Sequence, residues 1–312
     1  LAYASKTLEG QRITTSLPID LQQKVSQIVA GYYSHYSQSE IYNMAALVVE
    51  VKTRKVLAYV GNTPTDENHQ KDVDIIHAPR STGSVLKPFL YAAMLHEGEL
   101  LPTTLIPDVP TQIAGYSPQN FSNSFEGAVP ADMALAKSLN VPFVWLLRQF
   151  TTYRFYEVLQ KLRLKNISRH PDHYGLSIIL GGAESNLWDL AQAYTNLASE
   201  VNVFAATQQY RTAEFQSLSY TAGSPPDFGK ATTALPTIRA GALYSMFSAM
   251  KEVNRPTDDV AWRYYESARK VAWKTGTSFG NKDAWAIGAT PEYVVAVWVG
   301  NATGEGRPTL TG

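Results

Sequence analysis

Apolar residues recur at helical spacing near the start of the chain. Between Leu21 and Val29 they return every three or four positions, and Pro18 and Asp20 stand in front of them. This spacing places apolar side chains on one face of a helix, and proline and aspartate are typical of a helix start. The pattern predicts a helix over residues 18–36.

Apolar and β-branched runs indicate strands at both ends of the chain. Residues 43–51 and 56–61 are two such runs separated by the polar segment KTRK, which predicts a hairpin. Three further runs lie near the other end, and the last two are joined through Pro291 and Glu292. These three runs cover residues 270–278, 283–290 and 293–300. The pattern therefore predicts five strands.

The middle of the chain follows the helical period instead. Residues 130–200 read as mostly helical, with the clearest segments at 131–150 and 185–198. Residues 201–232 are polar, and the stretch GSPPDFG at 223–229 predicts an exposed loop.

A further helix, predicted over residues 236–253, leads back to the strands. Strands at both ends with helices between them favour an α/β (α+β) fold, in which helices cover a five-stranded, mainly antiparallel sheet. Residues 1–17 are mixed in composition and read as a linker or entry segment, so residues 18–312 form the predicted domain. A domain of this length can bury a full core.

The composition argues against several classes of function. The 27 basic and 27 acidic residues balance, so the chain lacks the positive excess typical of nucleic-acid-binding proteins. Cysteine is absent, which removes disulfides, thiolate metal sites and cysteine nucleophiles. His170 and His173 lie close in sequence, but Pro171 between them favours a surface turn over a metal site. We therefore expect no metal and no cofactor, and no apolar run reaches the length of a membrane helix.

Three short motifs occur in order along the chain. SVLK begins at Ser84, directly after a glycine and at the start of an apolar helical segment. SLN begins at Ser138 in the helical middle, and KTG begins at Lys274 in a predicted strand. The Ser-x-x-Lys spacing also occurs at Ser248 and Ser267, but neither follows a glycine, and both are interpreted as solvated helix or loop positions.

Each motif alone also has a structural explanation. SLN fits an N-cap pair before a helix that starts near Pro142, a favourable first helical residue. KTG fits a strand that ends in a turn. The order of the three motifs, each in a suitable element, favours a catalytic interpretation of the set.

The set resembles the signature of penicillin-binding proteins and serine β-lactamases. The resemblance extends through RSTGSVLKPFLYAAML and AWKTGTSFGNKDAWAIGATPEYVVAVWVGN, and it covers about residues 15–303. In these stretches the chain is similar to the transpeptidase domain of class A penicillin-binding proteins, of the penicillin-binding protein 1C type. Members of that family are membrane-anchored and carry an N-terminal glycosyltransferase domain. The resemblance therefore implies a fragment of a longer protein, without that domain.

The first motif suits a serine nucleophile with a lysine base. A serine hydroxyl attacks well only when a base takes its proton. Lys87 lies three residues after Ser84, on the same face of the predicted helix. A lysine accepts a proton only when neutral, and burial and a second cation both lower a lysine pKa. We expect Lys87 to be buried, with Lys274 as the second cation.

The resemblance implies further catalytic roles in the second and third motifs. Ser138 relays a proton toward the leaving amine. Asn140 holds the substrate amide and helps to anchor Lys87. Lys274 sets the local electric field.

The resemblance also implies how the substrate is bound. Thr275 and Thr277 bind the terminal carboxylate of the peptide. Gly276 leaves room for the peptide along the strand edge, where a side chain would clash. The backbone N–H groups of Ser84 and Thr277 form the oxyanion hole.

Two positions depart from the family pattern. Phe143 stands where a small alanine is usual, and Asn281 with Lys282 replaces an aromatic–arginine pair before DAWA. Both lie next to the expected site, so they bear on substrate preference and not on the chemistry.

The resemblance implies a peptidoglycan D,D-transpeptidase, a serine-type acyltransferase. Ser84 attacks the D-Ala-D-Ala bond of a stem peptide, D-Ala leaves, and an amine of a neighbouring stem peptide takes the acyl group. The expected partners are peptidoglycan stem peptides, β-lactam antibiotics as covalent inhibitors, and other wall-synthesis proteins. The expected location is the periplasmic (extracytoplasmic) face of the bacterial inner membrane.

Three other functions of the same fold stay open. A β-lactamase needs an added base, and the Glu-x-x-Leu-Asn stretch that supplies it in class A β-lactamases does not occur in this sequence. A penicillin-sensing or scaffold domain with little turnover shares all three motifs. A D,D-carboxypeptidase differs only in using water as the acceptor.

Overall fold

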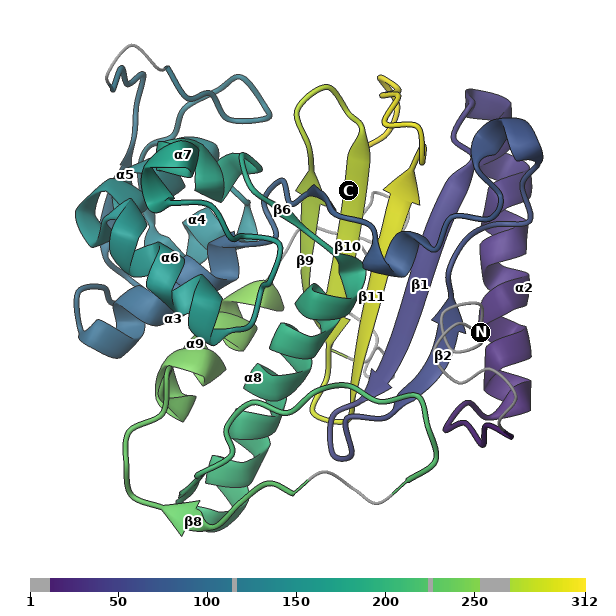
Figure 1. Ribbon diagram of the computed structural model, residues 1–312. Coiled ribbons are helices and arrows are strands. Elements are labelled where there is room, and N and C mark those ends of the chain that lie inside the picture. The colour runs from purple at the N-terminus through teal and green to yellow at the C-terminus, as the bar shows by residue number, and fades with distance from the viewer. Residues whose placement is uncertain (1–11, 114–116, 224–226, 253–269) are drawn as a thin grey trace.

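A five-stranded antiparallel sheet forms the centre of the computed structural model (Figure 1). The structure describes residues 12–113, 117–223, 227–252 and 270–312. The strands of this sheet are β1 (Asn43–Glu50), β2 (Val56–Val60), β9 (Ala272–Thr277), β10 (Asp283–Ala289) and β11 (Tyr293–Gly300). Their order is β2-β1-β11-β10-β9, so both ends of the chain contribute to one sheet. The predicted fold class is confirmed.

The two faces of the sheet have different covers, because side chains alternate between the faces of a strand. Helix α2 (Ile19–Tyr36) packs on one face, against Met44 and Ala46 of β1. On the opposite face Ala45 belongs to the main hydrophobic core, and helix α8 (Leu187–Thr207) packs over β1 and β11. Figure 1 shows α2 on one side of the sheet and the other helices on the opposite side.

The segment between β2 and β9 carries most of the described helices, and they form a lobe beside the edge strand β9 (Figure 1). Besides α8, the helices among its described residues are α3 (Lys87–Glu97), α4 (Ala131–Ala136), α5 (Asn140–Phe150), α6 (Thr152–Lys161), α7 (Pro171–Tyr174) and α9 (Ala240–Met250). The short strands are β3 (Arg80–Ser81), β4 (Leu105–Asp108), β5 (Gly127–Pro130), β6 (Glu184–Ser185), β7 (Tyr210–Arg211) and β8 (Ala231–Thr232). Short 3₁₀ turns occupy Ser37–Ser39, Glu67–His69, Ile75–His77 and Gly175–Leu180.

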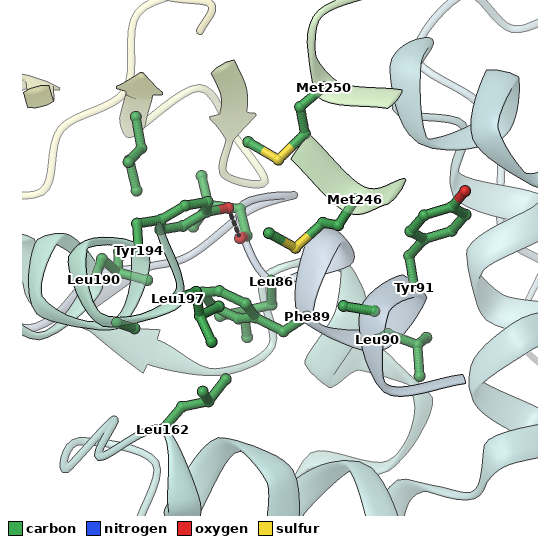
Figure 2. Packing of buried hydrophobic residues seen from close by; sticks show 14 of the residues in the cluster. Leu86, Phe89, Leu90, Tyr91, Leu162, Leu190, Tyr194, Leu197, Met246 and Met250 are labelled. Atoms are coloured by element: carbon green, nitrogen blue, oxygen red, sulfur yellow. Dashed lines mark hydrogen bonds between the residues drawn. The ribbon is translucent and has the colours of Figure 1, made fainter. Parts of the chain in front are cut away.

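Side chains from three helices fill the core between the sheet and the lobe (Figure 2). Phe89 of α3 and Tyr194 of α8 pack with ring centroids 5.0 Å apart, and Met246 of α9 is buried in the same cluster. Burial of each such side chain stabilises the fold by about 1.5–3 kcal/mol. The Tyr194 hydroxyl also donates to the carbonyl of Val85 at 3.1 Å. Because Val85 directly follows Ser84, the core fixes the turn that carries the candidate nucleophile.

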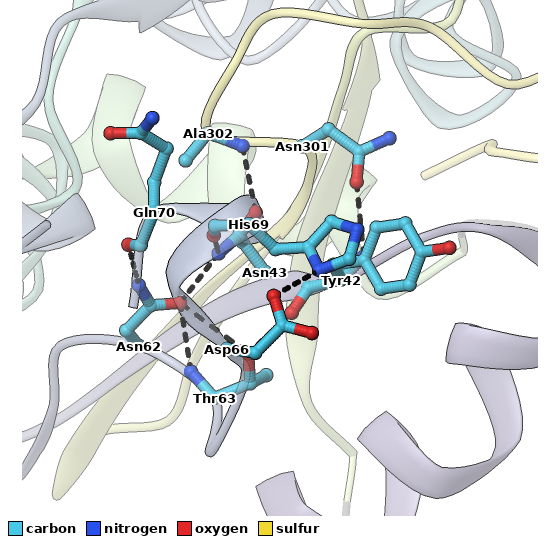
Figure 3. A network of polar contacts seen from close by, with 9 residues as sticks. All are labelled: Tyr42, Asn43, Asn62, Thr63, Asp66, His69, Gln70, Asn301 and Ala302. Carbon is cyan, nitrogen blue, oxygen red and sulfur yellow. Dashed lines mark hydrogen bonds and ion pairs between the residues drawn. The ribbon is translucent and has the colours of Figure 1, made fainter. Parts of the chain in front are cut away.

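A polar network ties the loop after β2 to the ends of β1 and β11 (Figure 3). The side-chain amide of Asn43 donates to Asn62 Oδ1 at 3.0 Å and to the carbonyl of His69 at 2.8 Å. Its oxygen accepts from the backbone N–H of Ala302 at 2.8 Å. The His69 ring stacks on Tyr42, with centroids 3.6 Å apart. These contacts hold the beginning of the segment that follows β11.

The helix predicted over residues 131–150 is interrupted, and that prediction is wrong at residues 137–139, where α4 ends before α5 begins. Ser138 has φ 56 there, a left-handed conformation that breaks the helical hydrogen-bond pattern. The apolar periodicity continues across the break, so the sequence pattern does not reveal it.

Two other predicted boundaries differ from the structure. The polar segment predicted from residue 201 starts too early, because α8 continues to Thr207. Helix α9 begins at Ala240 and not at Pro236, and the predicted end at Val253 lies outside the described residues.

The first described residues lie against the sheet. Of the predicted linker 1–17, the structure describes residues 12–17, where Ser16 Oγ donates to the carbonyl of Val56 at 2.7 Å. Of the predicted loop 223–229, residues 224–226 lie outside the described ranges. Within those ranges, no helix combines the length and apolar character that crossing a bilayer requires.

Candidate active site

The three motifs meet between the helical lobe and strand β9. Ser84 lies in the turn before α3, and Lys87 is the first residue of that helix. Of the SLN motif, Ser138 and Leu139 lie in the break between α4 and α5, and Asn140 begins α5. KTG lies on the edge strand. Lys274 Nζ donates to Ser138 Oγ at 2.7 Å, and Lys87 Nζ donates to Asn140 Oδ1 at 2.6 Å. Each lysine therefore bonds a different side chain of the second motif.

Lys87 is fully buried and surrounded by acceptors. Besides Asn140, its Nζ donates to the carbonyls of Ser138 at 2.7 Å and Leu139 at 3.1 Å. An ammonium group has three protons, and each has an acceptor here. The ring centroid of Phe143 lies 5.5 Å from Nζ, within the range at which an aromatic face attracts a cation. Phe143 thus packs against the lysine itself.

Burial changes the acidity of both lysines. It lowers the pKa of Lys87 well below the ordinary lysine value, and the positive charge of Lys274 lowers that pKa further. Burial also lowers the pKa of Lys274 to about 7. Desolvation penalises the ammonium form, so each of these lysines loses its proton at a lower pH than a lysine in water does.

The backbone of the second motif is strained in a way that serves both lysines. The left-handed conformation of Ser138, with φ 56, is uncommon for a residue other than glycine. The carbonyl of Ser138 accepts from Lys87, while its Oγ accepts from Lys274. The left-handed residue is thus the one whose carbonyl and hydroxyl bond the two lysines, so the strain coincides with these polar contacts.

The cap of α5 comes from outside the motif. Leu139 is the N-cap residue and supplies no side-chain hydrogen bond to the helix. Instead, Asn120 Oδ1 accepts from the backbone N–H groups of Asn140 at 2.9 Å and Val141 at 3.2 Å. The interpretation of SLN as an N-cap pair is therefore wrong, because its polar side chains bond the lysines.

Asn120 and Asp108 are two residues that the sequence analysis missed. Both are buried, and Asn120 Nδ2 donates to Asp108 Oδ1 at 2.7 Å. In the same loop the carbonyl of Gln119 accepts from Asn140 Nδ2 at 2.8 Å, which leaves Asn140 Oδ1 for Lys87. Asparagines in a polar loop are usually solvated, so the sequence carries no signal for this role.

Two glycines allow the turn before α3 to lie against β9. A Cβ atom on Gly83, whose φ is 50, would lie 2.6 Å from the carbonyl oxygen of Thr277. A Cβ atom on Gly276 would lie 2.9 Å from the Thr82 carbonyl oxygen and 3.2 Å from the backbone nitrogen of Ser84. The two backbones can approach this closely because neither glycine carries a Cβ. The amide of Ser84 consequently lies beside the strand that carries Thr277.

The candidate nucleophile is accessible from solvent. Ser84 is partly exposed, and its Oγ has no hydrogen-bond partner among the described residues. Thr275 and Thr277 are partly exposed too, and alternation along β9 places both on one face of the strand and Lys274 on the other. Lys274 Nζ also donates to the carbonyl of Thr275 at 2.6 Å.

The other candidates from the sequence lie apart from this site. Ser248 is on α9, and Ser267 lies outside the described residues. His170 accepts from a backbone N–H of the short helix α7, and His173 Nε2 lies 3.1 Å from the guanidinium of Arg169. Clusters of three or more His, Cys, Asp or Glu side chains able to hold a metal ion are absent from the part of the chain that the structure describes.

Comparison with known proteins gives consistent matches. Residues 44–309 match the family described as the penicillin binding protein transpeptidase domain. Over 297 residues, 95% of this chain, the sequence is 32% identical to penicillin-binding protein 1C of Escherichia coli strain K12. The matched region is 36% of that protein, so the chain spans little more than a third of the relative's length.

Solved structures share the same fold. The penicillin-binding protein PonA1 from Mycobacterium tuberculosis superimposes with a TM-score of 0.73 at 19% identity, covering 98% of this chain and 82% of that chain. PonA1 in complex with penicillin V gives a TM-score of 0.72 at 20% identity, covering 98% and 81%.

Proposed function

This chain belongs to the family of penicillin-binding protein transpeptidase domains, and on that premise we propose that it is a serine acyltransferase that cross-links peptidoglycan stem peptides and is acylated by penicillins. The observation that carries the proposal is the convergence of the three motifs, in which Lys87 bonds Asn140 and Lys274 bonds Ser138. Ser84 is the proposed nucleophile because it is the partly exposed hydroxyl on the turn that leads into Lys87.

Acylation begins when neutral Lys87 takes the proton of Ser84. Oγ then bonds to the carbonyl carbon of the penultimate D-Ala, and a tetrahedral oxyanion forms. A neutral amine has two protons, so Lys87 gives up one of its three acceptors when it acts as the base. The bond to the Leu139 carbonyl, at 3.1 Å, is the longest of the three and is the one we propose to break.

Ser138 supplies the proton that the leaving group needs. Its Oγ accepts a hydrogen bond from Lys274, so its own O–H is available to donate. When the C–N bond breaks, the nitrogen of the terminal D-Ala takes the proton of Ser138, and Lys274 replaces it. One proton thus moves from Ser84 to the leaving amine in net terms, and the positive charge moves from Lys274 to Lys87. A Lys274 pKa of about 7 suits this donation near neutral pH.

Backbone and side-chain donors stabilise the charges of the substrate. The N–H groups of Ser84 and Thr277 form the proposed oxyanion hole, and the close approach of Gly83 to β9 supports this pairing. Such a donor contributes roughly 3 kcal/mol to the transition state. The hydroxyls of Thr275 and Thr277, which share one face of β9, bind the terminal carboxylate of the donor peptide.

Transfer to the acceptor reverses the first half of the reaction. An amine of a second stem peptide attacks the acyl carbon, and the bond to Ser84 Oγ breaks as the serine recovers a proton from Lys87. The attacking nitrogen gives a proton to Ser138 Oγ, whose own proton passes to Lys274, so both lysines return to their starting states. No metal and no organic cofactor takes part in either half of this proposed scheme.

The wider setting is also a proposal. The match to a relative of much greater length supports a transpeptidase domain, residues 18–312, within a longer membrane-anchored wall-synthesis protein. Bacterial penicillin-binding proteins are proteins of the cell envelope, and D-Ala-D-Ala stem peptides are exposed at the periplasmic face of the inner membrane.

The activity is tested with a stem pentapeptide that ends in D-Ala-D-Ala and an amine acceptor. Wild-type protein should release one D-Ala for each cross-linked product, and Ser84→Ala should lower both rates at least ~1000-fold. Release of D-Ala without cross-linked product would point to a carboxypeptidase instead. Equal release by Ser84→Ala would exclude Ser84 as the nucleophile.

A further inference from the structure

The segment after β11 folds back onto the turn between β9 and β10, and we call residues 304–312 the strap. The backbone N–H of Arg307 donates to the carbonyl of Asn281 in that turn at 3.0 Å. Asn281 Nδ2 donates in return to the carbonyl of Leu310 at 2.8 Å. The side chain of Leu310 is buried in a small cluster with Ala284 of β10. Two reciprocal hydrogen bonds and one buried apolar side chain therefore hold the strap on the turn.

Close packing supports this attachment. A Cβ atom on Gly306 would overlap the carbonyl oxygen of Gly280, so the strap and the turn are in backbone contact there. Arg307 also pairs with Glu40 at 3.0 Å and with Glu305 at 3.1 Å, but both carboxylates are about two-thirds exposed, so these pairs add little. Asn301, drawn in Figure 3, holds the beginning of the segment by accepting from the N–H of Tyr42 at 3.0 Å.

The strap reaches the third motif at its far end. The backbone N–H of Gly312 donates to Thr277 Oγ1 at 2.9 Å. A Cβ atom on Gly312 would lie 2.5 Å from the carbonyl oxygen of Gly276 and 2.9 Å from that of Trp285, so the strap lies directly over the backbone of β9 and β10. The contact with Thr277 is therefore part of a packed surface.

We propose that the strap is a positioning device that sets the hydroxyl of Thr277 for the substrate carboxylate. The inference rests on the proposed function, in which Thr277 binds that carboxylate. A threonine hydroxyl has one proton, and a carboxylate accepts hydrogen bonds but donates none. Because Thr277 Oγ1 accepts from Gly312, its own proton is directed away from the strap and is available to the carboxylate.

The same contacts give Asn281 a role. This residue departs from the family pattern, and its φ of 52 is a conformation that asparagine tolerates better than most residues. Its carbonyl and its side-chain amide both bond the strap. Asn281 is accordingly a positioning residue, which acts on the substrate through the strap and Thr277.

The test compares two acyl donors that differ only in one charge. One is a D-alanyl thioester whose leaving group carries a carboxylate, and the other is the same thioester with that carboxylate methylated. Asn281→Gly removes the amide that holds Leu310 and keeps the backbone conformation. Gly312→Pro removes the donor to Thr277 and also adds a Cβ against the Gly276 carbonyl oxygen, so it displaces the end of the strap. Thr311→Ala is the matched control, because Thr311 is an exposed residue of the same strap.

For the acid thioester, kcat/KM should fall about tenfold in Asn281→Gly and in Gly312→Pro, mainly through KM, because a hydrogen bond to a charged group is weakened. For the methylated thioester, kcat/KM should stay at the wild-type value, as it should for both donors in Thr311→Ala. When Thr277→Val is already present, adding Asn281→Gly should cause no further loss. Thermal unfolding of each variant checks that it is folded.

Equal losses for the two donors, or a loss that persists beside Thr277→Val, would show that the strap acts only on stability and would overturn the proposal. A wild-type protein that is acylated by neither donor would overturn the proposed function, and the role of the strap with it. The two failures are distinguishable, because the first requires an active wild-type enzyme and the second excludes one.

Discussion

Lys87 and Lys274 are charged side chains that polar atoms of one short motif hold inside the protein. Lys87 is 0% exposed and Lys274 is 1% exposed. For Lys274 the change in pKa from 10.5 to about 7 corresponds to roughly 5 kcal/mol of lost preference for the charged form. The acceptors around the two nitrogens do not restore that preference, so burial of the charged lysines costs stability and suits both to the proton transfer proposed above.

The influence of Lys274 on Lys87 predicts a change in the pH profile of acylation. Replacing Lys274 by Met removes a positive charge that lowers the pKa of Lys87. The pKa of Lys87 should then rise, so the acid limb of a plot of acylation rate against pH should move to higher pH. Lys274→Arg keeps the charge and should leave the limb near its wild-type position. Identical profiles for Met and Arg variants would refute the electrostatic coupling.

Asn120 should matter for catalysis although it touches neither the substrate nor the lysines. Asn120→Ala removes the acceptor for the N–H groups of Asn140 and Val141, and loss of such a cap costs about 1 kcal/mol of stability. Because Asn140 then loses part of its support, acylation by penicillin should slow about tenfold. Ser122→Ala, on the exposed part of the same loop, is the control. Normal acylation of a destabilised Asn120→Ala would mean that this residue supports only the fold.

The motif residues and the residues that support them differ in whether their roles could be predicted from the sequence. Ser84, Lys87 and Lys274 could be proposed as a set because they stand in three motifs whose order resembles the signature of a known family. Asn120 and Asp108 could not, since their importance comes from burial and from hydrogen bonds that only the folded loop creates. The residues assigned to the chemistry stand in recognisable sequence motifs. The residues that hold them in place, Asn120 and Asp108, do not.

At the scale of elements, the site depends on a turn and a strand that lie in backbone contact. Strand β9 is at the edge of the sheet, so one side of it faces the turn before α3 and not another strand. The strands themselves could be predicted from alternating and β-branched runs, and the break between α4 and α5 could not, because apolar residues continue across it. The close approach between Gly83 and strand β9 could not be predicted either, because such a contact produces no periodic pattern in the sequence.

Adding one methyl group at the turn should disrupt both stability and activity. In Gly83→Ala the new Cβ would lie 2.6 Å from the Thr277 carbonyl oxygen, at a residue with positive φ. The turn would have to move away from β9, so we expect a loss of more than ~2 kcal/mol in unfolding free energy and a large drop in penicillin acylation. Urea unfolding and acylation rates measure the two effects.

Gly31→Ala is the matched comparison for that substitution. Gly31 lies within α2, with nothing within 4 Å of a Cβ built on it. Alanine there should stabilise the protein by about 0.5–1 kcal/mol without changing acylation, because alanine favours the helix. A stable and active Gly83→Ala protein would contradict the tight contact between the turn and β9.

At the scale of the whole molecule, the fold brings together motifs from distant parts of the chain. One end of the sheet comes from the N-terminal half and the other from the C-terminal segment, and the helical lobe between them supplies Ser138 and Asn140. The arrangement of strands and helices could be predicted as a class, since both ends showed strand patterns. The strap could not, because its contacts depend on how residues 304–312 fold back on the sheet.

The buried lysines should make stability rise with pH in the alkaline range. Between pH 7 and 10.5 an unfolded Lys274 binds a proton that the folded residue has lost. Stability therefore increases as pH rises through this window, by up to about 1.4 kcal/mol per pH unit from this residue. Lys274→Met should show a shallower rise in urea midpoints between pH 7 and 9, and the exposed Lys282→Met should match wild type. Equal slopes for both variants would argue against a depressed Lys274 pKa.

The mass of the intact protein after addition of a penicillin tests the central claim most directly. Wild-type protein should gain the mass of one drug molecule and keep it for many minutes, because a transpeptidase acyl-enzyme is deacylated slowly by water. Ser84→Ala should gain nothing. An adduct that disappears within seconds while the drug is consumed would instead indicate a β-lactamase. An adduct that forms equally on Ser84→Ala would contradict the assignment of Ser84, and with it the account of the whole site.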